Sequence, residues 1–166
     1  MIPAPREPGR YRVGMVCLGN ICRSPMADVV LQAKLADAGL DDVVSVDSCG
    51  TGGWHVGDPM DDRAAATLAD AGYDPTRHRA QQYADHWRDD HDLLLAMDEA
   101  NLADIGGRGD RVLLLRDLDP DEPGAVVPDP YYGGDDGFRE VLAMVERSCD
   151  ALVDALDDLP DLRAAR

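Results

Sequence analysis

Tyr11-Arg-Val-Gly-Met-Val16 is a short apolar run, and Cys17-Leu18-Gly19-Asn20-Ile21-Cys22-Arg23-Ser24-Pro25 follows it directly. The run predicts a buried β-strand. Serine is a favoured N-cap and proline suits the first helical position, so Ser24-Pro25 predicts the start of a helix that stops at Gly39. Strand, loop and helix in this order are typical of the opening of an α/β fold.

The same alternation continues along the rest of the chain. Further strands are predicted at 43–46, 92–97 and 111–115, helices at 62–71, 98–105 and 138–159, and a glycine-rich loop at 48–58. Strands separated by helices pair in parallel through right-handed crossovers. In such open sheets the site lies beyond the carboxyl ends of the strands, where the loop from Cys17 to Arg23 is expected.

Length and composition narrow the class of protein. The chain has 166 residues, of which 45% are hydrophobic, and this suits one domain with one core. We predict that domain at 11–159, with a flexible N-terminal extension at 1–10 and a C-terminal tail at 160–166. The formal net charge of −17 argues against binding to nucleic acid or to an anionic membrane surface.

The sequence also bears on location. No stretch approaches the about 20 apolar residues of a membrane span, and the N-terminus lacks the apolar region of a secretory signal. The four cysteines show no disulfide pattern and are expected to be reduced thiols. These features favour the cytoplasm, and they leave secretion without a leader open.

The loop from Cys17 to Arg23 has the make-up of an oxyanion site. Successive backbone N–H groups at the start of a helix form an anion nest, and the helix dipole adds positive potential there. Arg23 can offer a bidentate fork to two phosphoryl oxygens. The same donors, with the Ser24 hydroxyl, would favour the Cys17 thiolate, which is the form that attacks phosphorus. For the Cys-x5-Arg spacing taken alone, a buried structural cysteine and a surface arginine remain the alternative.

The motif resembles that of the low-molecular-weight protein tyrosine phosphatases and differs from the commonest bacterial version mainly at Leu18. The resemblance covers about 11–159. It implies a four-stranded parallel sheet in the order 2-1-3-4 with helices on both faces, and hydrolysis of phosphotyrosine and aryl phosphate esters through a phosphocysteine on Cys17. We expect no cofactor and no metal. Besides Arg23, the loop residues assigned to phosphate and substrate binding are Leu18, Gly19, Asn20, Ile21, Cys22 and Ser24.

The resemblance also selects a general acid. Taken alone, Asp129 in Pro128-Asp129-Pro130-Tyr131-Tyr132 is a turn aspartate, one of 33 acidic residues. The family carries its general acid in a matching motif, so Asp129 is expected to protonate the leaving oxygen and later to activate water. By the same resemblance, Tyr131 and Tyr132 form an aromatic wall beside the phosphotyrosine ring, and Trp54 lies at the pocket entrance.

Cys22 and Cys49 can also be compared with the family. In similar phosphatases a cysteine at the position of Cys22 can form a reversible disulfide with the nucleophile, which here is Cys17. A small buried thiol is an equally open interpretation. Ser48-Cys49-Gly50-Thr51 departs from the family's usual Ser-Ala-Gly-Thr at Cys49, a change expected to affect packing.

Three other functions compete with this interpretation. An arsenate reductase shares this fold and loop but needs a relay of further cysteines, and none lies between Cys49 and Cys149. A silent phosphotyrosine-binding module would be expected to lack the nucleophile or the acid. An acid phosphatase for small aryl phosphates is poorly separated from a protein phosphatase. We expect a monomer that acts on phosphotyrosine proteins or peptides, and the sequence leaves a phosphoarginine substrate open.

Overall fold

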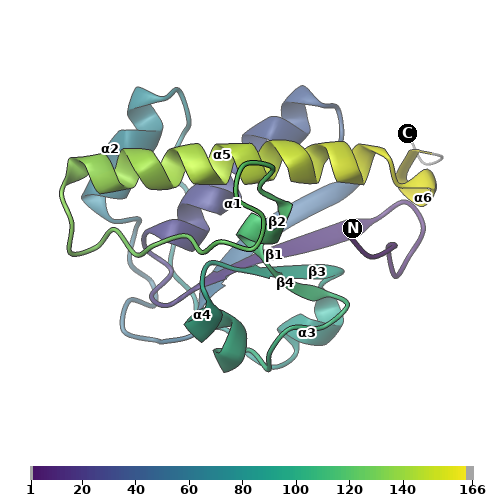
Figure 1. Ribbon diagram of the computed structural model, residues 1–166, viewed down its shortest axis with the longest axis horizontal. Helices are drawn as coiled ribbons and strands as arrows, with labels where there is room; N and C mark the ends of the chain where they lie inside the picture. Colours follow the sequence, from purple (N-terminus) through teal and green to yellow (C-terminus); the bar gives the residue numbers. More distant parts are fainter. Residues whose placement is uncertain (1, 164–166) are drawn as a thin grey trace.

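A four-stranded parallel sheet in the order β2-β1-β3-β4 forms the centre of this computed structural model (Figure 1). The structure describes residues 2–163. The strands are β1 (Tyr11–Cys17), β2 (Val44–Gly50), β3 (Leu93–Ala96) and β4 (Val112–Leu114). The parallel pairing and the strand order confirm the predicted fold class.

Helices cover both faces of the sheet. One face carries α1 (Arg23–Asp37), α2 (Asp62–Asp70) and the long α5 (Asp135–Asp157), which spans the molecule in Figure 1. The other face carries α3 (Trp87–Asp90) and α4 (Glu99–Asp104). A 3₁₀ turn, η1 (Leu115–Leu118), follows β4, and α6 (Pro160–Arg163) follows α5.

Each face of the sheet has its own apolar cluster. Val13 and Met15 of β1 belong to the larger cluster with α1 and α5, whereas Val16 belongs to the smaller one with α3 and α4. Because both faces are buried, β1 reads as a nearly continuous apolar run instead of alternating with polar residues. The sheet is therefore a rigid platform for the loop that leaves β1 at Cys17.

Several boundaries differ from the sequence prediction. The strand expected at 43–46 is β2, which continues to Gly50 because Ser48 and Gly50 pair with Met15 and Cys17 of β1. The glycine-rich loop therefore begins after β2. Helix α5 begins three residues before the predicted start, where two aspartates in its first turn complement the helix dipole. The short α3, η1 and α6 were not predicted, since four residues carry no detectable periodicity.

The N-terminal segment, expected to be a flexible extension, lies against the domain. Ile2 is buried, and the carbonyl oxygen of Pro3 accepts a hydrogen bond from the Tyr11 hydroxyl at 3.0 Å. The Asp92 carboxylate accepts the backbone N–H of Arg6 at 2.7 Å. In the predicted tail, Leu162 of α6 is buried, and 164–166 lie outside the described residues. Within 2–163, no helix is both long and apolar enough to cross a bilayer.

Candidate active site

The loop between β1 and α1 folds around the sulfur of Cys17. Cys17 is the last residue of β1, and its side chain is buried. The backbone N–H of Asn20 points back at Cys17 Sγ at 3.3 Å. Asn20 has a φ of 58°, in the left-handed region that asparagine tolerates better than most residues. The chain therefore turns back toward the sulfur at Asn20.

Ser24 does not cap the helix as expected. Helix α1 begins at Arg23, two residues before the predicted first helical residue Pro25, and the residue before it makes no side-chain cap. The Ser24 Oγ lies 2.9 Å from Cys17 Sγ, where either atom could donate, and 3.3 Å from the Cys49 carbonyl oxygen, to which the hydroxyl donates. The Ser24 hydroxyl thus contacts the Cys17 sulfur and the Cys49 carbonyl, and it does not cap the helix.

Asn20 is the centre of a buried hydrogen-bond network. Its side-chain amide donates to Ser24 Oγ at 2.8 Å and to Ser48 Oγ at 3.0 Å, while its Oδ1 accepts from the Gln81 backbone N–H at 2.9 Å. Its carbonyl lies 2.7 Å from His78 Nε2, and since a carbonyl can only accept, this nitrogen donates. Burial lowers the pKa of His78, which favours the neutral form of the ring. The network holds the left-handed turn.

Gly50 lets the loop pass close to β2. A Cβ atom at this position would lie 2.7 Å from the Leu18 carbonyl oxygen and 3.0 Å from the Asn20 nitrogen. Any side chain would therefore push the loop away from the sheet. The backbone N–H groups of Thr51 and Gly52 then donate to the carbonyls of Cys17 and Leu18, each at 2.9 Å.

Arg23 is buried at the start of α1 and is held from outside the loop. Its Nη1 lies 2.6 Å from Asp98 Oδ2 and donates to the Val127 carbonyl oxygen at 3.0 Å. Its Nη2 lies 3.7 Å from Asp129 Oδ2. Asp129 itself accepts the backbone N–H of Tyr131 at 3.0 Å, as an aspartate in a turn does. The guanidinium therefore connects the loop to the segment that carries the expected acid.

The cysteine loop and the segment around Asp129 line one pocket of about 320 Å³. Of the residues predicted for the site, those that line it are Cys17, Leu18, Gly19, Ile21, Cys22, Arg23, Trp54, Asp129, Tyr131 and Tyr132. Asn20 and Ser24, also predicted for the site, do not line the pocket, and their side chains support the loop through hydrogen bonds. Trp54 and Tyr132 have exposed fractions of 72% and 92%, so they form the rim of the pocket and leave rings free for contact.

The four cysteines are free thiols, and all are buried. Burial raises the pKa of the Cys22 thiol to about 12, and the nearby Asp61 adds to the effect. Burial likewise raises the pKa values of Cys49 and Cys149. A disulfide between Cys22 and Cys17 stays a prediction. Cys49, in β2, packs in the smaller apolar cluster with α3 and α4.

Sequence reasoning missed three residues that shape the site. Asp98 pairs with Arg23, Gln81 binds both Asn20 and the Ser48 carbonyl, and Arg63 contacts the loop around Asp129. A signal existed only for Asp98, which directly follows a predicted strand at the edge of the sheet where sites form.

Comparisons with known proteins identify the family of this chain. The family model described as "Low molecular weight phosphotyrosine protein phosphatase" matches residues 12–160, so the chain belongs to that family. It is 47% identical over 163 residues to the low molecular weight protein-tyrosine-phosphatase of Streptomyces coelicolor, covering 93% of this chain and 99% of that protein. It is 44% identical over 152 residues to the low molecular weight protein-tyrosine phosphatase A of Mycobacterium tuberculosis, covering 88% and 91%.

Solved structures show the same architecture. The crystal structure of YfkJ from Bacillus subtilis matches with a TM-score of 0.83 and 33% identity, covering 89% of this chain and 95% of that one. A protein tyrosine phosphatase from Entamoeba histolytica, crystallised with Hepes in its active site, matches with a TM-score of 0.84 and 29% identity, covering 89% and 97%.

Proposed function

We propose that this protein hydrolyses phosphotyrosine monoesters through a phosphocysteine on Cys17. The observation that carries the proposal is the shared pocket, in which a nucleophilic sulfur, a buried arginine and an exposed carboxyl group meet. Membership of the phosphotyrosine phosphatase family and the names of the relatives support the same reaction.

In the first step the Cys17 thiolate attacks phosphorus in line with the ester oxygen. The S–P bond forms while the P–O bond to the aryl group breaks. Arg23 and the backbone N–H groups of the loop bind the equatorial oxygens, on which charge builds up in the transition state. Asp129 gives its proton to the leaving aryl oxygen, so that a phenol departs instead of a phenolate.

In the second step a water molecule attacks the phosphocysteine. Asp129, now a carboxylate, takes a proton from this water while the new P–O bond forms. The S–P bond breaks, the thiolate of Cys17 leaves, and inorganic phosphate is released. The Ser24 hydroxyl, 2.9 Å from the sulfur, turns its one proton from the Cys49 carbonyl to the departing thiolate and stabilises it.

The pocket favours an aromatic phosphate ester on a protein or peptide. Trp54, Tyr131 and Tyr132 can stack on a phosphotyrosine ring, and their exposure leaves room for residues on either side of it. We extend the proposal to a cytoplasmic enzyme, because a reducing compartment keeps four free thiols reduced. A monomer that acts in signalling belongs to the same proposal.

The test is turnover of p-nitrophenyl phosphate from about pH 5 to 8 under reducing conditions with EDTA. The wild type should be active, Cys17→Ser inactive, and Asp129→Ala slower by roughly 10²- to 10⁴-fold. Phosphotyrosine peptides then test the substrate class, with phosphoarginine and arsenate as the competing substrates. An inactive wild type, or full activity in Cys17→Ser, would refute the proposal.

A further inference from the structure

The start of α2 lies between the two segments that make the site. Asp61 precedes α2, and its carboxylate caps the helix through the backbone N–H groups of Arg63 and Ala64. The backbone N–H of Asp61 donates to the carbonyl of Ile21 in the cysteine loop at 2.9 Å. One end of α2 is therefore attached directly to the phosphate-binding loop.

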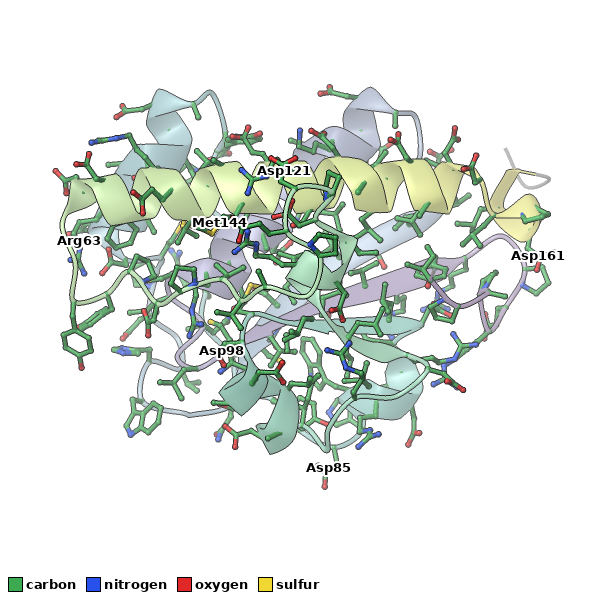
Figure 2. All side chains as sticks on the ribbon, in the orientation of Figure 1. Arg63, Asp85, Asp98, Asp121, Met144 and Asp161 are labelled. Atoms are coloured by element: carbon green, nitrogen blue, oxygen red, sulfur yellow. The ribbon has the colours of Figure 1, made fainter. Side chains whose placement is uncertain are left out.

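Arg63 attaches the same end of α2 to the segment that carries Asp129. Its Nη1 donates to the Gly133 carbonyl oxygen at 3.4 Å. Its guanidinium carbon lies 5.4 Å from the ring centre of Tyr131 and 4.8 Å from that of Phe138, the buried ring in the first turn of α5. Figure 2 shows Arg63 beside the start of α5, where this segment enters the helix.

The guanidinium is itself held in place. Its Nε lies 3.3 Å from Asp61 Oδ1 and its Nη2 lies 3.3 Å from Asp61 Oδ2, a two-point contact that fixes the plane of the group. A planar group oriented in this way can face two rings and still donate to a carbonyl, which a lysine ammonium cannot do. Arg63 is thus oriented by the residue that contacts the cysteine loop.

We propose that Arg63 is a positioning residue for general-acid catalysis, because it fixes the 129–133 segment relative to the cysteine loop. The proposal rests on the proposed role of Asp129. The Asp129 carboxyl group is 38% exposed and lies 3.7 Å from Arg23, so Arg23 alone does not determine its place. Proton transfer to a leaving group needs an approach within about 3.2 Å, so a small shift of this segment lowers the rate.

The leaving group provides the readout. An ester with a poor leaving group, phenyl phosphate, depends on the acid, whereas 2,4-dinitrophenyl phosphate releases a stable anion without a proton. The value of kcat/KM for phenyl phosphate should fall by about ten- to a hundredfold in Arg63→Met, while that for 2,4-dinitrophenyl phosphate is nearly kept. Arg63→Lys keeps the charge but not the planar fork, so its kcat/KM for phenyl phosphate should lie between those of the wild type and Arg63→Met. Inhibition by inorganic phosphate should stay the same, since Cys17 and Arg23 are untouched.

Three further variants complete the experiment. Arg108→Met removes another half-exposed arginine that is paired with an aspartate, Asp117, but lies away from the pocket, and it should match the wild type for every ester. Asp129→Asn shows how strongly kcat/KM depends on the leaving group when no general acid is present. The double variant Arg63→Met with Asp129→Asn should be no slower on phenyl phosphate than Asp129→Asn, because no acid is left to position.

The outcomes separate the two ideas. If Asp129→Asn loses rate equally on all esters, the proposed acid is wrong and the role of Arg63 is refuted with it. If Asp129→Asn is selective for phenyl phosphate but Arg63→Met is unchanged, or is slower on all esters alike, only the inference about Arg63 is overturned. The inference is supported if Arg63→Met and Asp129→Asn each lose activity selectively on phenyl phosphate, and if the double variant is no slower than Asp129→Asn alone.

Discussion

Arg23 Nη1 lies 2.6 Å from Asp98 Oδ2, although the two residues are 75 positions apart in the chain. The Arg23 side chain is only 3% exposed, and that of Asp98 is 27% exposed. The other oxygen of Asp98 caps α4 by accepting the Asn101 backbone N–H at 2.8 Å. Figure 2 shows Asp98 beside α4. A short turn after β3 therefore orients the arginine before any oxyanion arrives.

Replacing Asp98 should weaken substrate binding and stability together. In Asp98→Ala, Arg23 loses its charged partner and α4 loses its cap, so KM for p-nitrophenyl phosphate should rise by about tenfold. The free energy of unfolding in urea should fall by about 1 to 3 kcal/mol, because the pair is partly screened by solvent. Asp98→Asn keeps one acceptor oxygen, so its KM and its free energy of unfolding should lie between those of the wild type and Asp98→Ala. An unchanged KM in Asp98→Ala would contradict this role.

The contact between Ser24 and Cys17 predicts a loss of thiol reactivity in Ser24→Ala. The variant removes a hydroxyl 2.9 Å from the sulfur and leaves the Asn20 amide with one partner fewer. Alkylation of Cys17 by iodoacetamide near pH 6 should slow by about tenfold, as for a lost hydrogen bond to a charged group. Ser148→Ala is the matched control, since Ser148 is equally buried but donates only to Met144 in α5. Equal rates in all three proteins would refute the prediction.

Asp28 should make stability depend on pH. Burial raises the pKa of Asp28 to about 7, although the hydrogen bond from Gln32 acts to lower it. The folded chain thus holds a proton that the unfolded chain loses near pH 4, so this group's contribution to the free energy of unfolding declines from about pH 4 to pH 7. Asp28→Asn should gain stability relative to the wild type by about 1 to 3 kcal/mol between pH 5 and pH 8. A difference that stays constant over this range in urea titrations would argue against a raised pKa.

The four thiols should differ sharply toward an alkylating reagent. With the pKa of Cys22 near 12 and those of Cys49 and Cys149 also raised by burial, these three stay protonated at pH 7.5. Brief treatment with iodoacetamide should label one site per folded chain, Cys17, as located by peptide mass spectrometry. Cys17→Ser should take up almost none, and inorganic phosphate should protect the wild type. Labelling first at Cys22 would be incompatible with the prediction.

The strand, loop and helix around Cys17 could be predicted from the sequence because their signals are local. An apolar run and a proline near the helix start act within a few residues of one another. The Ser24 hydroxyl nevertheless contacts the sulfur of Cys17 instead of capping α1, which begins at Arg23. That hydrogen bond depends on how the loop closes in space, and no local pattern reports it.

The acidic residues of the site, in contrast, could not be predicted from local sequence signals. The sequence holds 33 acidic residues, and composition does not distinguish Asp98 or Asp129 from the others. A resemblance selected Asp129, and nothing selected Asp98 or the arginine, Arg63, that contacts the 129–133 segment. The sequence by itself determined a parallel α/β sheet with an oxyanion loop at the end of its first strand, because hydrophobic periodicity and turn chemistry are short-range. Only the tertiary structure decided which charges meet at that loop, because the packing of β3, α2 and α5 brings together residues that are far apart in the chain.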